Sequence, residues 1–361
     1  MANTNAYGFI GLEDLYSQRV ATVGVGRVYE AVQVSAAEYS RVVNSVVSEL
    51  VEPVTGALEQ IELPGDGTLQ PLDEWGNPMP VQPSGSYQVA YPIQGAGTAW
   101  GTNRVTGAML TVEEANRLTV DAFRRDADWM IRHIMSGILD NTTWTFQDKV
   151  GPNGAKGYGA LTIQPLANGD AVTYVKKGAT APATDTHYLF QAAAIADATN
   201  PYDDIYAELT EHPSNSGPIK CYISTSLVAT TQALTNFIAA SDPDIMLGGL
   251  NAQLSSSVDV GFGDRVLGKV DGCWIIEWGR LPAGYIIGHA SGTPVLGMRE
   301  YPAPELQGFF PEQHSPDGNT VVNRFLRYAG FGVKNRVAAV AYLVGAGAYA
   351  IPSGYTNPLP V

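Results

Sequence analysis

Charged residues are scarce in this sequence. They make up 16% of its 361 residues, against about 25% in ordinary soluble domains. A compact monomer of this mass would expose roughly 14,000 Å² of surface, and much of that surface would carry no charge. Because a lone soluble protein limits its exposed apolar patches to a few hundred Å², we expect this chain to bury much of its exterior against other subunits.

Positive charges are the scarcer of the two signs. Lysine and arginine total 21 against 35 aspartates and glutamates, so the formal net charge is −14. Tight binding to nucleic acid depends on Lys and Arg neutralising phosphates, and this balance argues against it. The acidic balance is still compatible with a wall that DNA touches without adhering.

Cysteines, targeting segments and long hydrophobic runs are also lacking. Cys221 and Cys273 are too few for a disulfide framework, and the start MANTNAYGFIGLEDLYSQ lacks the basic and apolar regions of a signal peptide. The longest uncharged apolar stretch, Val337–Ile351, has 15 residues, fewer than the roughly 20 that span a bilayer. We expect a chain that folds in a reducing cytosol and has no membrane segment.

Motifs of common catalytic sites are absent. The sequence has no GxSxG turn and no GxxxxGK[ST] loop, which mark many acyl- and phosphoryl-transfer enzymes. Gly24-Val25-Gly26 begins like a dinucleotide loop, but Tyr29 stands where the third glycine would be, and we expect no helix to start there. We therefore predict that the protein is not an enzyme and has no cofactor.

Two sets of side chains could supply metal ligands. The first set is His212, Cys221, Cys273 and His289. The second set is Asp203, Asp204, Asp242 and Asp244. Metal sites usually show close ligand spacing, and acidic turn residues are usually solvated or cap a helix. We favour packed histidines, buried cysteines and solvated aspartates, and predict no metal site.

Two segments of the first half have helical periodicity. After a strand-like stretch, Arg27–Val34, a Ser35/Glu38 capping box opens a predicted helix that ends at Pro53. The clearer helix of about 30 residues follows a second capping box, formed by Thr111 and Glu114. On its polar face we expect two i,i+4 ion pairs, Asp121 with Arg125 and Asp128 with Arg132.

Between these helices, residues 54–107 predict a long hairpin with an elaborate tip. Glycine or proline occupies 15 of these 54 positions, and alternating runs lie at Leu58–Leu63 and Tyr87–Ile93. A loop of this length is uncommon in a compact domain unless it has a function. We predict that its tip contacts another subunit through Asp73, Glu74, Trp75 and Asn77. An exposed Trp is typical of an interface anchor, and the alternative is that Trp75 packs on its own hairpin.

The rest of the chain alternates strands and helices. We predict a strand pair around Gly169, helices at Thr186–Ala198 and Leu227–Ala240, a mobile loop at Asp242–Gly263, and strands at Ile219–Ser224, Val266–Val270, Cys273–Trp278, Tyr285–Gly288 and Val295–Arg299. Asp271-Gly272 is a strong hairpin signal. The C-terminal segment VVNRFLRYAGFGVKNRVAAVAYLV alternates as strands with one buried face do.

This order of elements resembles a known family. Together with RVLGKVDGCWIIEWGRLPAGYIIGHASGTPVLGMREY at 265–301 and the closing strands, it is similar to the major capsid proteins of tailed bacteriophages. These have the Hong Kong ninety-seven (Johnson) fold, which bacterial encapsulin shells share. The resemblance implies an α+β chain with an N-terminal arm at 1–53, an extended loop at 54–107, a peripheral domain at 108–185 and 302–361, and an axial domain at 186–301.

The resemblance also implies a function. Such proteins form icosahedral shells of hexamers and pentamers around packaged double-stranded DNA, with scaffolding, portal and decoration proteins as partners, so the chain would assemble in the host cytoplasm and reside in the virion. Two departures matter. The capsid elements begin within the first 30 or so positions, which favours a separate scaffolding protein, and no Lys precedes Lys149, which argues against a Lys–Asn crosslink from the loop.

Two alternatives remain at this point. An encapsulin-like nanocompartment shell would have the same fold with a cargo groove on its inner face, but the proline-rich loop tip and the insertion at 142–185 favour the phage protein. A cytosolic α/β enzyme is the more distant alternative.

Overall fold

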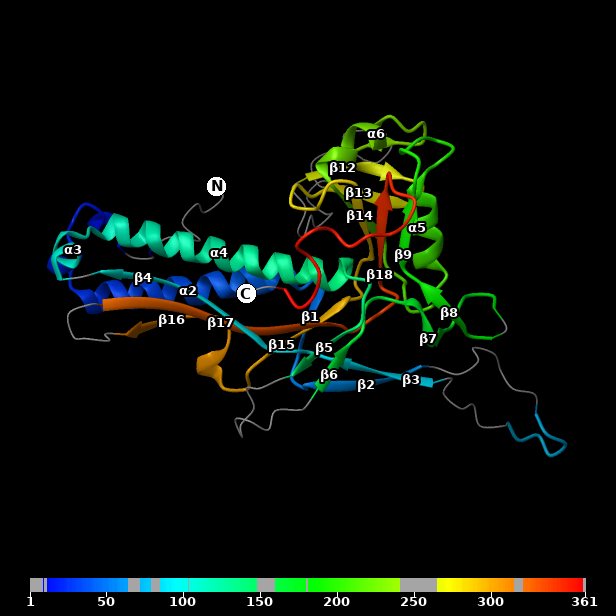
Figure 1. Ribbon diagram of the computed structural model, residues 1–361, viewed down its shortest axis with the longest axis horizontal. Coiled ribbons are helices and arrows are strands. Elements are labelled where there is room, and N and C mark those ends of the chain that lie inside the picture. The colour runs from blue at the N-terminus through cyan, green and yellow to red at the C-terminus, as the bar shows by residue number, and fades with distance from the viewer. Residues whose placement is uncertain are drawn as a thin grey trace.

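The protein is elongated, with a long arm formed by α2, α4 and β17. The loop that continues from β2 and β3, with its tip at residues 72–78, is called the projection. The computed structural model describes residue 9 and residues 12–63, 72–78, 85–102, 104–147, 160–179, 181–240, 265–314 and 321–359. In Figure 1 the helices α2 and α4 run along the long axis beside β17, a second sheet stands at the upper right, and the projection extends to the lower right.

The N-terminal segment is helical. It forms η1 (Glu13–Leu15), α1 (Val20–Val23) and α2 (Val25–Val47). The predicted strand Arg27–Val34 is therefore wrong, and Ser35 lies inside α2 and does not cap it. Val28 and Val32 are buried one turn apart in a cluster with Phe123, so burial against neighbouring elements outweighs the weak preference of valine for strands.

The second predicted helix is confirmed as α4 (Val112–Leu139). The Thr111 hydroxyl accepts a hydrogen bond from the Glu114 backbone N–H at 3.2 Å, so this cap forms. A short helix, α3 (Arg104–Met109), precedes it. α4 buries one face along its whole length, which makes it the central support of both halves of the molecule.

The two ion pairs predicted on α4 are wrong. Arg125 donates to the Thr98 hydroxyl and Arg132 donates to the Gly354 carbonyl, both far away in sequence. The aspartates instead pair as Asp121 with Arg124 and Asp128 with Arg280. Three of the four side chains thus contact other segments, and Asp121 pairs within α4 at i,i+3. The i,i+4 pairs are easily replaced because they contribute only tenths of a kcal/mol.

A five-stranded sheet lies against α2 and α4. Its strands are β1 (Val51–Val54), β15 (Leu296–Glu300), β17 (Val321–Val333), β16 (Phe309–His314) and β4 (Gln94–Thr102). The order is β1-β15-β17-β16, and β4 also pairs with β17. Pro53, which was predicted to end a helix, lies in β1. This strand pairs in parallel with β15, where Pro53 is opposite Met298.

The second sheet has seven strands in the order β11-β12-β13-β10-β14-β18-β9. They are β9 (Tyr188–Gln191), β10 (Ile219–Ile223), β11 (Ile238–Ala239), β12 (Arg265–Val270), β13 (Cys273–Glu277), β14 (Tyr285–Ala290) and β18 (Ala339–Val344). The predicted β12–β13 hairpin is confirmed, with Asp271 and Gly272 both at positive φ, 44° and 92°. Positive φ at both positions is the geometry of a type I′ turn.

Two helix predictions in this region need correction. The predicted helix Thr186–Ala198 is wrong, because β9 occupies its first half and the helix α5 begins only at Pro201 and ends at Thr210. Leu227–Ala240 is not one helix but η2 (Thr225–Leu227), α6 (Val228–Gln232) and β11. The predicted mobile loop Asp242–Gly263 lies outside the described residues.

Three smaller hairpins and one turn complete the fold. The hairpins are β2 (Leu58–Leu63) with β3 (Gly85–Ala90), β5 (Trp144–Gln147) with β6 (Ala160–Ile163), and β7 (Asn168–Tyr174) with β8 (Ala183–Thr186); the turn is η4 (Pro304–Leu306). Gly169 lies inside β7, so the predicted strands on either side of it belong to different hairpins. Within the described ranges, no helix is long and apolar enough to cross a membrane.

Candidate functional site

Within the predicted range 54–107, the structure confirms a hairpin of β2 and β3, whereas β4 joins the five-stranded sheet and α3 follows it. The base of the hairpin is fixed to the body of the protein. β2 and β3 pair in register from Leu58 opposite Ala90 to Leu63 opposite Gly85. The Tyr87 hydroxyl donates to the Lys334 carbonyl at 3.0 Å. Side chains from the hairpin and from the segment around β7 are buried in one cluster: Leu63, Tyr87, Val89, Tyr91, Ala167 and Tyr174. The projection therefore starts from a rigid base.

The tip of the projection has its own folded geometry. Asp73 Oδ1 accepts hydrogen bonds from the backbone N–H groups of Trp75 at 2.9 Å and Asn77 at 2.7 Å, and its Oδ2 accepts from the Asn77 amide at 3.1 Å. Leu72 and Pro78 close the turn as an antiparallel bridge. The pKa of Asp73 is lowered mainly by the hydrogen bond from the Asn77 backbone N–H and, next, by the one from the Asn77 side chain. A carboxylate that satisfies several backbone donors is typical of an Asx turn.

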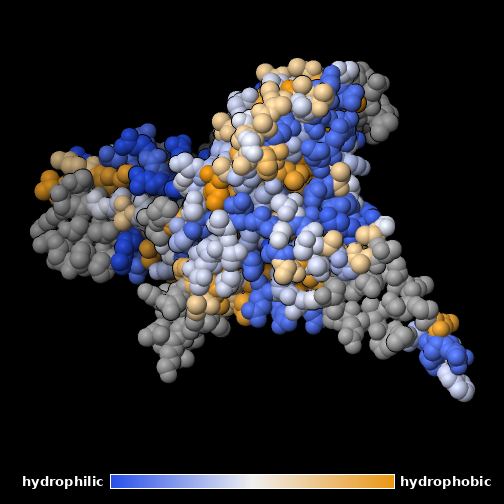
Figure 2. All heavy atoms as spheres, turned by 45° about the vertical axis from the view of Figure 1, so that its right-hand side comes forward, coloured by the Kyte–Doolittle hydropathy of each residue, from blue (hydrophilic) through white to orange (hydrophobic). Residues whose placement is uncertain are grey.

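This turn presents Trp75 outward. The side chain of Trp75 is 87% exposed, and Leu72 and Glu74 are exposed beside it. The alternative that Trp75 packs on its own hairpin is therefore wrong for the single chain. Figure 2 shows the projection standing away from the body, with both hydrophobic and hydrophilic side chains at its end. An acidic turn with one outward indole has the chemistry of an interface anchor.

Further exposed apolar side chains lie at the other end of the molecule. Val105 on α3 is 75% exposed and Met109 is also exposed, as are Val25 and Val34 on α2. In Figure 1, α3 lies at the opposite end of the long axis from the tip. The molecule thus offers apolar contact surfaces at both ends, which suits contacts with several neighbours.

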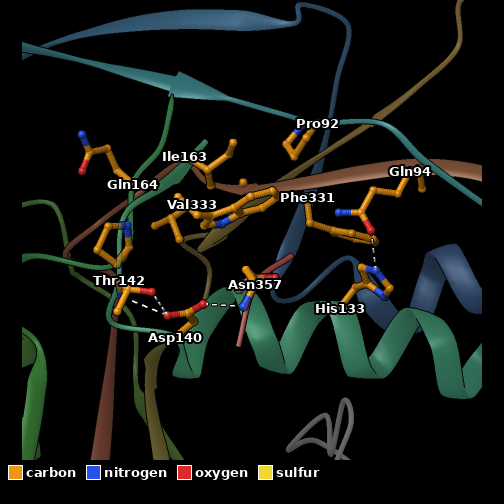
Figure 3. A pocket seen from close by; sticks show the side chains of 15 residues that line it. Pro92, Gln94, His133, Asp140, Thr142, Ile163, Gln164, Phe331, Val333 and Asn357 are labelled. Atoms are coloured by element: carbon orange, nitrogen blue, oxygen red, sulfur yellow. Dashed lines mark hydrogen bonds between the residues drawn. The ribbon is translucent and has the colours of Figure 1, made fainter. Parts of the chain in front are cut away.

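A small cavity lies where α4 ends (Figure 3). Its volume of about 20 Å³ leaves room for roughly one water molecule. On one side the Asp140 carboxylate accepts from the Thr142 backbone N–H at 2.9 Å and from the Asn357 backbone N–H at 2.7 Å. On the other, burial lowers the pKa of His133 to about 4, and its Nε2 contacts the Gln94 side chain at 3.2 Å. The cavity is too small for a substrate, so these groups have a structural role.

The first metal-ligand set considered from the sequence does not assemble. Cys221 and Cys273 are buried in the neighbouring strands β10 and β13, where burial raises the pKa of Cys221. His289 is bonded to a backbone carbonyl through Nε2. His212 instead faces His187, with 3.1 Å between the two Nε2 atoms. Among the described residues, the groups close enough to share an ion include neither cysteine nor His289.

Of the four aspartates in the second metal-ligand set, only Asp203 and Asp204 lie within the described residues. Asp203 and Asp204 lie in the first turn of α5, where acidic side chains stabilise a helix N-terminus. The Asp204 carboxylate accepts from the Tyr342 hydroxyl at 3.1 Å. Asp242 and Asp244 lie outside the described ranges. Asn200 caps the helix, and the two aspartates are exposed first-turn residues, as the solvated interpretation expected.

Gly24-Val25-Gly26 is also explained by the structure. The expectation that no helix starts there is wrong, because α2 begins at Val25. However, the element before it is the helix α1 and not a strand, whereas a dinucleotide loop joins a strand to a helix. Gly24 has φ 100° and links the two helices. No dinucleotide site is formed.

One buried polar group was missed from the sequence. Asp185, His187 and His212 place a carboxylate and two imidazoles within 4.8 Å of one another. The available signals were the alternation of Asp185 and His187 at the end of a strand and the spacing of Glu208, Glu211 and His212. No single motif joins the two segments, because β9 and α5 separate them along the chain.

Comparison with solved structures identifies the fold. A chain from a structure of Mycobacterium phage Patience matches 96% of this chain over 95% of its own length, at 18% identity and a TM-score of 0.67. A chain from the asymmetric unit of the bacteriophage PhiM1 mature capsid matches 82% over 85%, at 9% identity and a TM-score of 0.51. No family model matches the sequence, and no curated protein matches it. The chain therefore has a mixed α+β fold that matches those of phage capsids.

Proposed function

We propose that this chain is the major capsid protein of a tailed bacteriophage and that it assembles into an icosahedral shell of hexamers and pentamers around packaged DNA. The observation that carries the proposal is the fold similarity to phage structures, which in one case extends over nearly the whole chain. One of the similar chains comes from a mature phage capsid. The role is structural, and no catalytic step is required of any side chain.

The surface of the single chain supports assembly. Its exposed area is 18,094 Å², whereas a compact monomer of this mass would expose roughly 14,000 Å². The elongated arm and the projection in Figure 1 account for such an excess. A chain that exposes this much surface with only 16% charged residues is well suited to bury it against copies of itself.

We assign the parts of the Johnson fold as follows. Residues 1–53 are the N-terminal arm, 54–107 the extended loop, 108–185 and 302–361 the peripheral domain, and 186–301 the axial domain. α4 is the spine helix of the peripheral domain, and the seven-stranded sheet is the centre of the axial domain. Two strands cross these bounds, because β18 of the seven-stranded sheet comes from 302–361 and β15 of the five-stranded sheet comes from 186–301. The extended loop reaches a neighbouring subunit through Asp73, Glu74, Trp75 and Asn77.

The charge balance suits contact with packaged DNA. With a net charge of −14, the shell would hold double-stranded DNA without binding it tightly, because tight binding requires neutralised phosphates. The expected partners are further copies of the chain, a scaffolding protein, a portal and a decoration protein. Assembly would take place in the host cytoplasm and the finished location is the virion.

Electron microscopy of the purified chain tests the proposal. The chain, expressed with and without a candidate scaffolding protein, should form closed shells with five- and six-fold clusters, and shells from infected cells should contain DNA. Shells loaded with a cargo enzyme and free of DNA would instead identify a nanocompartment. A stable monomer at micromolar concentration, without shells in any extract, would overturn the proposal.

A further inference from the structure

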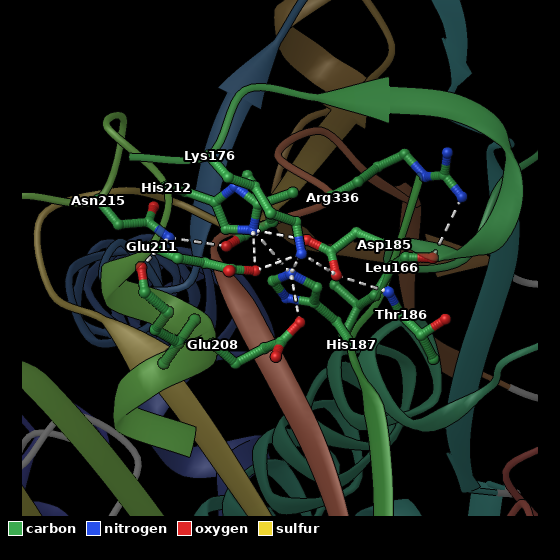
Figure 4. Close-up of polar contacts among 12 residues, drawn as sticks. Leu166, Lys176, Asp185, Thr186, His187, Glu208, Glu211, His212, Asn215 and Arg336 are labelled. Carbon is green, nitrogen blue, oxygen red and sulfur yellow. Dashed lines mark hydrogen bonds and ion pairs between the residues drawn. The ribbon is translucent and has the colours of Figure 1, made fainter. Parts of the chain in front are cut away.

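The buried group around His187 and His212 lies where three elements meet. Asp185 is in β8, His187 lies between β8 and β9, and His212 follows α5. Their side chains are 4%, 0% and 2% exposed. Figure 4 shows the three side chains converging, with Glu208, Glu211 and Lys176 around them. A polar cluster this deep needs a partner for each of its atoms.

The hydrogen bonds of the two imidazoles fix their tautomers. His187 Nδ1 lies 2.8 Å from the Ala339 carbonyl, and His212 Nδ1 lies 3.2 Å from the Val175 carbonyl. A carbonyl only accepts, so each Nδ1 carries the proton. In the neutral rings each Nε2 then presents a lone pair, and these two atoms face each other at 3.1 Å. A histidine whose Nδ1 donates to a backbone carbonyl is the usual arrangement behind a metal-bound Nε2.

The carboxylate of Asp185 points into the same space. Its Oδ2 lies 2.9 Å from His212 Nε2 and 3.5 Å from His187 Nε2, and it accepts no hydrogen bond of good geometry. Burial would raise the pKa of Asp185, but the contacts with His187 and His212 hold it below its ordinary value. When both rings are neutral, three lone-pair atoms therefore converge, and their repulsion is relieved either by a cation at their centre or by a proton on one imidazole.

The distances between the three atoms fit such a cation. Zinc binds nitrogen and oxygen ligands at about 2.0–2.1 Å, which places two ligands of a tetrahedron about 3.3–3.4 Å apart. The observed separations of 3.1, 2.9 and 3.5 Å are close to this edge length. Imidazole ligands favour zinc and its neighbours over calcium or magnesium, which prefer oxygen ligands alone.

A fourth ligand is within reach. Glu208 Oε1 lies 3.9 Å from His187 Nε2, whereas Glu211 is already paired with Lys176 at 2.6 Å. Lys176 also lies 3.1 Å from the Asp185 carboxylate, so three carboxyl groups surround one ammonium group and Glu208 has no ion pair with Lys176 within the described residues.

We propose that Asp185, His187 and His212 bind a tetrahedral divalent transition-metal ion of the zinc type, with Glu208 as the fourth ligand. The ion would link the β7–β8 hairpin, through Asp185, to the segment after α5, through His212. A cavity of about 670 Å³ lies beside one proposed ligand, since Tyr174, Lys176 and His212 line it. The proposal does not depend on shell formation.

The test is metal binding by the full chain. After treatment with a chelator and desalting, the protein should bind one Zn²⁺ per chain by calorimetry, gain thermal stability, and show the visible absorption of tetrahedral Co²⁺ when Co²⁺ is added. His212→Gln should abolish all three signals. His289→Gln is the matched control, since His289 is equally buried but outside the cluster, and it should bind as the unsubstituted chain does.

A milder variant guards against misfolding. Glu208 is partly exposed, so Glu208→Gln should fold and weaken Zn²⁺ binding by about tenfold or more. If the folded wild-type chain binds neither Zn²⁺ nor Co²⁺, and NMR shows one imidazole protonated at neutral pH, the cluster is an ion pair that shares a proton and the metal proposal is wrong.

Discussion

Arg327 of β17 and Asp126 of α4 form a two-point ion pair inside the protein. Arg327 Nε donates to Asp126 Oδ1 at 2.6 Å and Arg327 Nη2 to Oδ2 at 2.8 Å. The Tyr39 hydroxyl of α2 donates to the same carboxylate at 3.0 Å. Both charged side chains are essentially fully buried. One carboxylate thus fixes the positions of α2, α4 and the five-stranded sheet relative to one another.

Asp126→Asn should strongly destabilise the folded chain. Removal of one partner leaves the Arg327 guanidinium buried with only Glu300, at 3.6 Å, as a counter-charge. Breaking a buried pair in this way costs about 3–5 kcal/mol. Denaturant unfolding of the unassembled chain measures the change in the free energy of unfolding.

Asp121→Asn is the control for this prediction. Asp121 and Arg124 form an exposed pair on the same helix at 3.6 Å, and such pairs contribute about 0–1 kcal/mol. Replacing Asp126 and Arg327 together by apolar residues of similar volume should cost less than Asp126→Asn alone. Equal effects of Asp126→Asn and Asp121→Asn would contradict the assigned role.

His133 should make the stability of the chain depend on pH. Burial lowers its pKa from 6.5 to about 4, so the folded chain binds a proton less readily than the unfolded chain. The corresponding stability is complete above about pH 6.5 and is lost as the pH falls through 4, with a maximum loss of roughly 3 kcal/mol. Unfolding experiments between pH 4 and 7 should show a shallower pH dependence for His133→Gln than for the wild type. If His133→Gln and the wild type show the same pH dependence of stability, other titratable groups cause that dependence.

Trp75→Ala should impair shells and leave the single chain unaffected. Because the indole is 87% exposed, its loss should change the melting temperature of the unassembled chain little, while a lost aromatic anchor commonly costs 2 kcal/mol or more at an interface. Yield and denaturant resistance of shells measure the effect. Phe190→Ala, at an exposed aromatic position on β9 outside the loop tip, serves as the control.

Removal of the whole projection extends this test. Replacing residues 64–84 by a short Gly/Ser turn retains β2 and β3 and should leave α4 and both sheets folded by circular dichroism, but without shells. Shells of normal stability from this variant would show that the projection is not a subunit contact.

The shell should be held without covalent bonds between subunits. No lysine precedes Lys149, so the loop has no amine for an isopeptide bond. Lys176, Lys220 and Lys334 are each paired with carboxylates of the same chain, so their amines are engaged within the subunit. Particles boiled in detergent with reductant should run as one band near 38.4 kDa. A ladder of larger species would reveal a crosslink from another lysine.

The elements predicted correctly are those with strong local signals. α4 has both a cap and a sustained period, and Asp271-Gly272 fixes its hairpin through positive φ values. The errors arose where local preference and tertiary contact disagree. The alanine-rich segment after Thr186 has helical propensity, but β9 obtains its backbone hydrogen bonds from β18, and the Asn200 cap with Pro201 starts the helix later. Propensity differences of tenths of a kcal/mol per residue are too small to prevail.

The same reasoning limits what could be said of sites. The loop tip could be proposed as a contact from the sequence because its residues are contiguous, and the structure adds the turn in which Asp73 holds Trp75 outward. Its role as a subunit contact stays a prediction. The cluster of Asp185, His187 and His212 was not predictable, because its geometry depends on how β8 and α5 pack. Spacing along the chain carries no information about that packing.

The position of β17 and β18 has a consequence for synthesis. β18 lies between β14 and β9, and β17 lies between β15 or β4 and β16, so neither sheet can close until residues 321–344 have left the ribosome. Pairings between such distant segments form late. A nascent chain would therefore lack the finished surfaces of our proposed shell contacts until residues 321–344 have emerged, which separates the folding of each copy from its assembly with others.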